Sequence, residues 1–111
     1  MLPPDSTATA VAAGVQATVA DALRVEQVGA LPFAHIRALV ADIVTVAEDE
    51  MLAAVRLLAN QARLVAEPGG AAAVAAWLYH REELPPAATA VAVLSGGNID
   101  PALLATTLAR D

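Results

Sequence analysis

The sequence predicts an α/β fold in which a partial parallel sheet of few strands is covered by packed, alanine-rich helices. Two observations predict this fold class. Short valine-rich runs at residues 42–46 and 90–94 have the apolar composition of strands that are covered on both faces. Helical patterns precede, separate and follow these runs, and such alternation is typical of parallel α/β proteins.

The composition restricts the class of protein further. The 111 residues suffice for one domain with a core, and 58% apolar against 16% charged residues excludes a disordered chain. The net charge of −6 and the scattered arginines give no basic stripe, so we expect no nucleic-acid partner. The sequence contains neither cysteine nor lysine, which excludes a disulfide framework and a Schiff-base lysine within these residues.

No targeting or membrane segment is expected. The first residues carry no basic region of the kind that opens a signal peptide. The longest apolar runs are too short to span a bilayer. We therefore expect a cytoplasmic protein that does not contact membranes.

The N-terminal residues 1–17 have the weakest pattern. A short alanine-rich helix is expected over Ser6–Ala13, with Gly14 as its end. The pattern of Val19–Val25 fits either a helical turn or a short extended piece. Apolar side chains then recur at helical spacing, and Pro32 suits a first turn, so the next helix is expected over residues 32–40.

Three acidic residues follow the first predicted strand, which covers residues 42–46. Glu48, Asp49 and Glu50 would occupy the first turn of a helix that runs to about Leu64, where the helix dipole stabilises negative charge. Consecutive residues point in different directions around a helix. A solvated face is therefore favoured over a metal site, and no metal is expected.

Glu67 lies between two predicted helices. Pro68 disfavours helical geometry at Glu67, and the next helix is expected from Ala71 to about Glu83. That helix is apolar all round for most of its length, which is typical of a helix packed on several sides. The Glu67 carboxylate fits two roles, an anion at a helix start or a group directed at a pocket.

The loop Ser95–Asn98 follows the second predicted strand, residues 90–94. Its two glycines allow positive φ and a close approach to a bulky neighbour. Asp100 is a good N-cap and Pro101 suits the first helical position, so a last helix is expected to about residue 110. Ligands of parallel α/β sheets bind where strands end and helices begin. Ser95 and Asn98 are thus candidate ligand-binding residues, although an ordinary strand-to-helix turn has the same pattern.

Several segments, taken together and in order, resemble a known family. They are Thr18–Asp21, Leu39–Val46, Leu57–Leu58, Leu64–Pro68, Gly70–Ala72 and Leu94–Asp100. In this order they resemble the C-terminal part of the threonine/serine dehydratase (ammonia-lyase) and serine racemase family, pyridoxal-phosphate enzymes of the tryptophan-synthase-like fold. The resemblance implies that residues 1–111 form a single partial domain, a fragment of a fold type II pyridoxal-phosphate enzyme domain.

The resemblance also implies a cofactor-binding role for Ser95, Gly96, Gly97, Asn98 and Glu67, with pyridoxal 5'-phosphate as the cofactor. Ser95 matches the family serine whose hydroxyl hydrogen-bonds the pyridine nitrogen, and residues 96–98 match the loop beside it. Glu67 matches a carboxylate near the cofactor ring. A neutral hydroxyl does not hold the nitrogen protonated as an aspartate would, which makes the ring a weaker electron sink and suits loss of a β-hydroxyl group.

The sequence also departs from the family pattern. The family's Schiff-base lysine and its glycine-rich phosphate loop lie upstream of the matched part, and neither is present here. Ala22 stands where members usually have a glycine close to the active site. The segment Leu2–Asp5 does not reproduce the acids of the metal loop that some members carry, which again predicts no metal.

We therefore expect a C-terminal fragment of a pyridoxal-phosphate-dependent threonine/serine dehydratase that is inactive alone. The whole enzyme would deaminate L-threonine or L-serine to a 2-oxo acid and ammonia, with serine racemase or hydroxyaspartate dehydratase as close alternatives. The expected partner is the N-terminal half of the enzyme, if it is split, or further copies of the chain. The high apolar content leaves open a non-catalytic interaction or oligomerisation module. A decayed reading frame whose product barely folds is a third interpretation.

Overall fold

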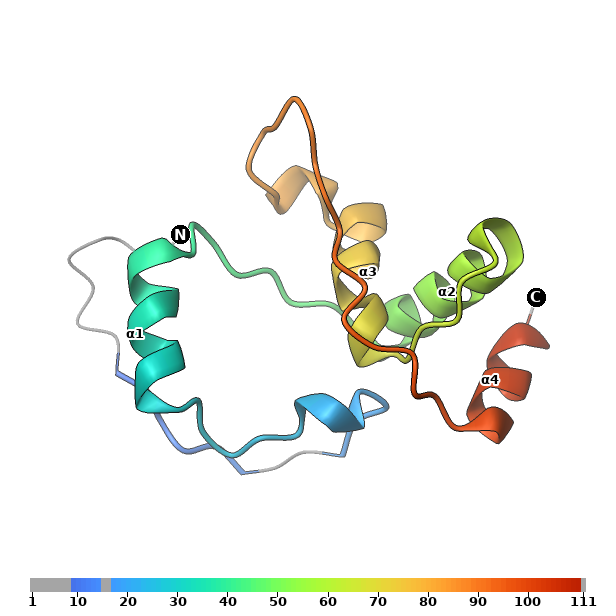
Figure 1. Ribbon diagram of the computed structural model, residues 1–111, viewed down its shortest axis with the longest axis horizontal. Coiled ribbons are helices and arrows are strands. Elements are labelled where there is room, and N and C mark those ends of the chain that lie inside the picture. Colours follow the sequence, from blue (N-terminus) through green and yellow to red (C-terminus); the bar gives the residue numbers. More distant parts are fainter. Residues whose placement is uncertain (1–8, 15–16, 111) are drawn as a thin grey trace.

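The structure is a computed structural model, and it describes residues 9–14 and 17–110. The α-helices in these ranges are α1 (Ala30–Leu39), α2 (Glu48–Leu57), α3 (Ala72–Tyr79) and α4 (Pro101–Leu108) (Figure 1). Short 3-10 turns lie at Asp21–Leu23, Gly69–Ala71 and Arg81–Glu83, and a π-helical turn lies at Leu58–Ala62. The radius of gyration is 15.4 Å, compared with about 13 Å for a compact domain of this length.

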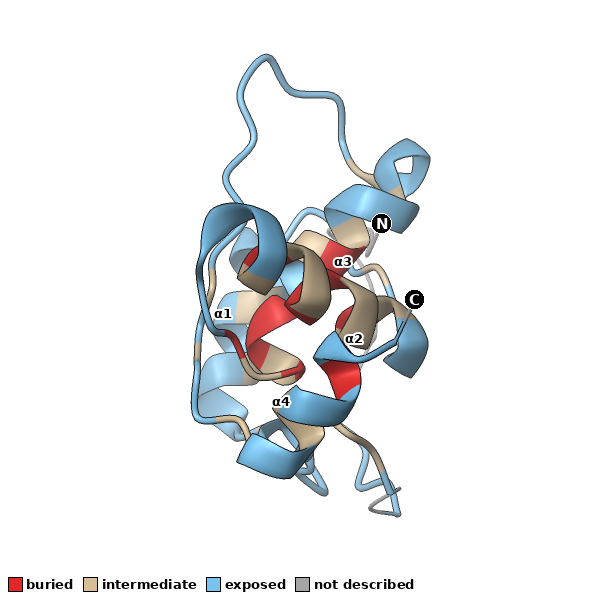
Figure 2. Cartoon of the chain, turned by 90° about the vertical axis from the view of Figure 1, so that its right-hand side faces the viewer, coloured by how far each residue is buried: buried red, intermediate tan, exposed pale blue. Residues whose placement is uncertain are grey.

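Helices α2, α3 and α4 form one cluster, and α1 stands apart from it (Figure 1). The core lies where α2 meets α3, and red segments mark it in Figure 2. Its buried residues are mostly small: Ala20, Met51, Ala54, Val55, Leu58, Ala66, Ala71 and Ala75. Small side chains at these positions let the helices approach closely, as the alanine-rich composition predicts. No residue of α1 is buried.

No β-strand is present in the part of the chain that the structure describes, so the expected sheet is not formed there. Residues 42–46 and 90–94 are extended, but no backbone hydrogen bond joins them to each other or to another described segment. A strand exists through hydrogen bonds to a neighbour, and local composition does not supply the neighbour. The strand pattern persists in part, because Val44 and Val46 are half-buried while Ile43 and Thr45 are exposed.

Helix α2 begins where the acidic residues predict. The Ala47 N–H donates a hydrogen bond to Glu50 Oε2 (2.8 Å), and Glu48 and Asp49 are exposed. No cluster of metal-binding side chains occurs among the described residues. The helix was expected to continue to about Leu64, but it gives way to the π-helical turn. Arg63 then adopts a left-handed conformation (φ 59°, ψ 32°) and ends it.

The helix expected over residues 71–83 is interrupted. A 3-10 turn opens it, α3 ends at Tyr79, and His80 leaves helical geometry (φ −124°, ψ 29°) before a second 3-10 turn. Helix α4 confirms its predicted start, since Asp100 Oδ1 accepts hydrogen bonds from the backbone N–H groups of Ala102 and Leu103, both 2.9 Å. Helix α1 contains Pro32 in its first turn, as predicted.

The N-terminal expectation is corrected where the structure allows. Residues 9–13 are not helical, and the rest of the expected helix, Ser6 to Ala8, lies outside the described residues. The Ala13 N–H donates to the Glu26 carbonyl oxygen (2.8 Å) instead, so this segment pairs with a distant one. The ambiguous stretch 19–25 forms the 3-10 turn Asp21–Leu23. Among the helices of the described residues, none has the length and apolarity needed to cross a membrane.

Candidate functional site

Glu67 and the loop Ser95–Asn98 are in direct contact. The Glu67 N–H donates a hydrogen bond to the Gly96 carbonyl oxygen, and the Asn98 N–H donates one to Glu67 Oε2, both at 3.1 Å. Glu67 therefore binds the loop at Gly96 through its main chain and at Asn98 through its side chain. The structure thus brings together the five residues that the sequence singles out, although Glu67 and Asn98 lie 31 positions apart along the chain.

The glycines of this loop are needed for close packing. A Cβ on Gly96 would lie 2.6 Å from Glu67 Oε1, and one on Gly97 would lie 2.8 Å from the Val65 carbonyl oxygen. Neither glycine has a positive φ, so that part of the expectation is wrong. The other part, a close approach to a neighbour, is confirmed.

Gly70 belongs to the same contact, which the sequence pattern did not predict. A Cβ on Gly70 would collide with the Gly96 carbonyl oxygen, so both sides of the contact depend on glycine. Gly70 is buried, and the signal that could have identified it was the second glycine of Gly69–Gly70, which a helix start does not require. The turn Asp21–Leu23 lies beside this segment, because a Cβ on Gly69 would be 3.3 Å from Leu23 Cγ.

The polar side chains of the loop are available to a ligand. Ser95 and Asn98 are exposed, and neither side chain forms a hydrogen bond with another described residue. The Ser95 hydroxyl can therefore donate or accept a hydrogen bond without breaking an existing one. The loop offers one hydroxyl and one side-chain amide beside a strip of backbone that carries no side chains.

A second cluster joins α2 to the end of α3. His80 Nε2 lies 2.9 Å from Glu50 Oε2, and His80 Nδ1 lies 2.6 Å from Glu83 Oε1. The hydrogen bonds to Glu50 and Glu83 raise the pKa of His80 above its usual value. The pKa of Glu50 is lowered, first by the Ala47 N–H and then by His80. The contacts of His80 with Glu50 and Glu83 fix the C-terminal end of α3 against α2. None of these three residues belongs to the loop Ser95–Asn98.

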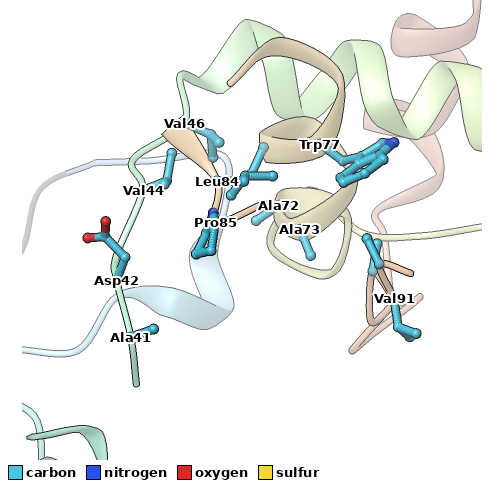
Figure 3. A pocket seen from close by; sticks show the side chains of 13 residues that line it. Ala41, Asp42, Val44, Val46, Ala72, Ala73, Trp77, Leu84, Pro85 and Val91 are labelled. Carbon is cyan, nitrogen blue, oxygen red and sulfur yellow. The ribbon is translucent and has the colours of Figure 1, made fainter. Parts of the chain in front are cut away.

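Helix α3 also forms the floor of a groove of about 570 Å³ (Figure 3). Ala72, Ala73 and Trp77 belong to this floor, the extended segment 41–46 lines one side, and residues 90–92 line the other. The Arg81 guanidinium lies over the Trp77 ring, 4.4 Å from its centroid. Leu84 and Pro85 complete the lining, so the groove is bounded by the two segments that the sequence predicts as strands and by the connector before the second of them.

Comparisons with known proteins agree with the resemblance. Residues 4–96 match the family described as pyridoxal-phosphate dependent enzyme. The chain is 40% identical over 80 residues to the biosynthetic L-threonine dehydratase of Halalkalibacterium halodurans, covering 72% of this chain and 19% of that protein. It is 35% identical over 91 residues to the L-threo-3-hydroxyaspartate ammonia-lyase of Saccharomyces cerevisiae, covering 82% and 28%. The crystal structure of a threonine deaminase from T.th. matches with a TM-score of 0.72 and 40% identity, over 78% of this chain and 29% of that chain.

The chain belongs to the family of pyridoxal-phosphate dependent enzymes. Its relatives within that family include threonine ammonia-lyases and a serine racemase. It spans 19% and 28% of the lengths of the two curated relatives described above, so its fold corresponds to a fragment of threonine deaminase.

The residues of the loop fit one edge of pyridoxal phosphate. An available hydroxyl at Ser95 suits a pyridine nitrogen, and the bare backbone at Gly96 and Gly97 leaves space for a flat ring. The opposite edge of the cofactor needs an amine for its aldehyde, and the sequence contains no lysine. The fit is thus to the nitrogen side of the ring.

Proposed function

We propose that this chain supplies the pyridine-nitrogen side of the cofactor site in a pyridoxal-phosphate-dependent threonine/serine dehydratase. The whole enzyme deaminates L-threonine or L-serine to a 2-oxo acid and ammonia. The single observation that carries the proposal is the Ser95 hydroxyl, exposed and without a hydrogen-bond partner among the described residues, on a loop that Glu67 holds. The dehydratase relatives support the reaction class.

In this proposal each residue of the site has its own role. Pyridoxal phosphate, when bound, supplies an electron sink for the amino acid. The Ser95 hydroxyl would donate a hydrogen bond to the ring nitrogen and keep its own proton. Glu67 orients the loop through the Asn98 N–H. Gly96 and Gly97 keep side chains out of the space beside the ring.

In this proposal residues 1–111 act as a single partial domain that is inactive without the remaining part of the enzyme. A lysine that holds the cofactor covalently must come from outside these residues, because none of the 111 is lysine. We propose the N-terminal part of the enzyme as that source. A cytoplasmic location belongs to the same proposal, as expected for amino-acid metabolism.

A chimera tests the proposal directly. Residues 18–108 of this chain would replace the matching region in the H. halodurans dehydratase, which supplies the lysine and the rest of the site. We expect the chimera to bind pyridoxal phosphate and to release ammonia from L-threonine or L-serine, while the isolated chain with cofactor releases none. A folded chimera that binds the cofactor without ammonia release would contradict the proposed reaction. Ammonia release by the isolated, lysine-free chain would contradict the proposal that the rest of the cofactor site lies outside these residues.

A second candidate substrate follows from the yeast relative, whose name states L-threo-3-hydroxyaspartate. The chimera does not decide between substrates, since the donor supplies the remaining residues. The comparison must be made on the enzyme that contains this chain, with the three amino acids supplied separately. Ammonia release from 3-hydroxyaspartate alone would replace the first proposal with this second one.

A non-catalytic oligomerisation module is a candidate of a different class, and the exposed apolar side chains favour it. Val91 is 84% exposed and Leu39 is 77% exposed, and both are large enough to matter in an interface. Sedimentation equilibrium of the isolated chain separates the cases. A stable homodimer that does not bind the remaining part of the enzyme would support the oligomerisation module.

A poorly cooperative thermal transition would instead favour the decayed reading frame.

A further inference from the structure

The turn Asp21–Leu23 is tied to the helix cluster by one side chain. The Val19 N–H, just before the turn, donates a hydrogen bond to Glu48 Oε1 (3.0 Å), although the two residues lie 29 positions apart. The other hydrogen bonds that residues 18–25 make with described residues stay within that segment. Glu48, in the first turn of α2, therefore supplies the hydrogen bond that fixes the entry of the turn.

The start of α2 does not account for this contact. Glu50 caps the helix by accepting the Ala47 N–H, and Asp49 forms no hydrogen bond or ion pair with another described residue. Glu48 and Asp49 are both exposed and both lie in the first turn, where the helix dipole stabilises each of them alike. They differ in the hydrogen bond to Val19, which makes Asp49 a matched control.

The turn packs against the glycine segment that carries the candidate site. A Cβ on Gly69 would lie 3.3 Å from Leu23 Cγ and 3.7 Å from the Cβ of Ala20, which is buried in the core. One position further on, Gly70 lies so close to Gly96 that a Cβ there would collide with the Gly96 carbonyl oxygen. A continuous path of close contacts therefore leads from the turn to the loop Ser95–Asn98.

We propose that Glu48 is a positioning residue of the candidate site. By holding Val19 it keeps the turn against Gly69, and the packed glycines transmit this position to the loop Ser95–Asn98. Among the described residues no hydrogen bond joins Glu48 to the loop, so its effect passes through the packed segments between them. The inference rests on the proposed function for what the loop binds, and the path of contacts stands independently of that function.

Hydrogen exchange of the isolated chain tests the path. In Glu48→Ala the Val19 amide loses its acceptor and should exchange about fivefold faster, and the Asn98 amide in the loop should exchange at least about twofold faster as its support loosens. Glu48→Gln keeps a side-chain oxygen as acceptor and should restore both rates to within about twofold of the natural chain. Asp49→Ala removes the same charge from the same helix turn and should change neither rate by more than about twofold.

Cofactor affinity tests the consequence for the site. In the chimera that contains residues 18–108, Glu48→Ala should weaken the binding of pyridoxal phosphate at least about threefold, since the loop is less well placed. Absorbance titration of the cofactor into the apo-chimera measures this. Glu48→Gln should restore the affinity and Asp49→Ala should preserve it, a pattern that a general loss of stability would not produce.

Several outcomes would overturn the inference and leave the proposed function standing. They are an unchanged exchange rate at Val19 in Glu48→Ala, faster exchange at Val19 with an unchanged rate at Asn98, and unchanged cofactor affinity of the substituted chimera. Equal effects of Glu48→Ala and Glu48→Gln would assign the role to the charge and overturn the inference as well.

A different result would count against the proposed function alone. The chimera with natural Glu48 would bind the cofactor but release no ammonia from L-threonine or L-serine, while Glu48→Ala still loosened the loop and weakened cofactor binding. Glu48 would then keep its positioning role in a site with another reaction.

Discussion

The Asn98 N–H donates a hydrogen bond to Glu67 Oε2 across 3.1 Å, and this contact joins two loops that are 31 residues apart in the sequence. The same glutamate also donates its own N–H to the Gly96 carbonyl oxygen. Replacement of Glu67 by alanine removes the side-chain acceptor and leaves the Asn98 N–H without its partner. We expect the free energy of unfolding to fall by about 1 kcal/mol and the Asn98 amide to exchange faster. Glu82, exposed and outside the site, provides the control as Glu82→Ala.

Gly96 is a position where an added methyl group would meet the Glu67 carboxylate directly. The new Cβ would lie 2.6 Å from Glu67 Oε1, closer than real contacts allow, so Gly96→Ala must displace the carboxylate or the loop. Displacement of the carboxylate breaks its hydrogen bond with the Asn98 N–H, a loss of about 1 kcal/mol that urea unfolding can measure. Gly14→Ala is the control, because nothing lies within 4 Å of a Cβ there. Equal stability of both variants would show that the loop is not packed against Glu67.

The role that we propose for Ser95 is one that stability measurements should not detect. Its hydroxyl makes no hydrogen bond with the described residues, so Ser95→Ala should change the unfolding free energy of the chain by less than about 0.5 kcal/mol. In the chimera the same substitution should lower kcat/KM at least about tenfold, through loss of the hydrogen bond to the ring nitrogen. Thr89 also carries an exposed hydroxyl and lies outside the loop, so Thr89→Ala serves as the matched control. An unchanged kcat/KM would remove Ser95 from the site.

His80 makes part of the stability depend on pH. Its pKa is raised by Glu50 and Glu83, so the ion pair contributes fully below the usual value of 6.5 and is lost as pH rises through the higher folded value. The lowered pKa of Glu50 means that the contribution is also lost at strongly acidic pH, as that carboxylate becomes protonated. The unfolding free energy of the natural chain should therefore exceed that of His80→Gln most clearly in mildly acidic buffer.

The measurement is a series of urea unfolding curves for both chains from about pH 4 to about pH 9, over which the difference should shrink toward alkaline pH. His35→Gln provides the control, since the His35 ring contacts the Leu31 carbonyl oxygen and no carboxylate of the described residues. A difference between the natural chain and His80→Gln that grows toward alkaline pH would contradict the ion pair.

Asp100 caps α4 through hydrogen bonds from Ala102 and Leu103. Asp100→Ala removes the acceptor and should lower the unfolding free energy by about 1 kcal/mol, with faster amide exchange at these two residues. Asp100→Asn keeps an acceptor and should lose much less. Equal losses for both variants would assign the effect to the charge and not to the cap.

The sequence predicts the local features of this fold well. The start of α2 at its acidic residues, the cap at Asp100 and the meeting of small residues in the core all depend on neighbours in the sequence or on side-chain size. The sheet could not be predicted in the same way. Residues 42–46 have the composition of a strand, but pairing requires a partner at the right distance, and the described residues do not supply one.

The contact between Glu67 and the loop 95–98 joins residues that the sequence singles out, and its geometry was predicted only in part. The loop 95–98 and Glu67 were both identified, and they do meet. The reason for the glycines was half correct, because close packing requires them and positive φ does not. Gly70 and the contact between His80 and Glu50 were missed, since each depends on a distant segment that no local pattern reveals.

The extended segment 90–94 has a consequence for the solubility of the chain. It is a run of apolar residues without charge, and Val91 and Val93 are largely exposed along an unpaired edge. Such an edge adds strands indiscriminately, including strands from identical chains, which is how aggregation starts. We therefore expect the chain to aggregate when it is produced without a partner that covers this edge. Under the proposed function, matched synthesis of this chain and the remaining part of the enzyme would be a condition of solubility as much as of catalysis.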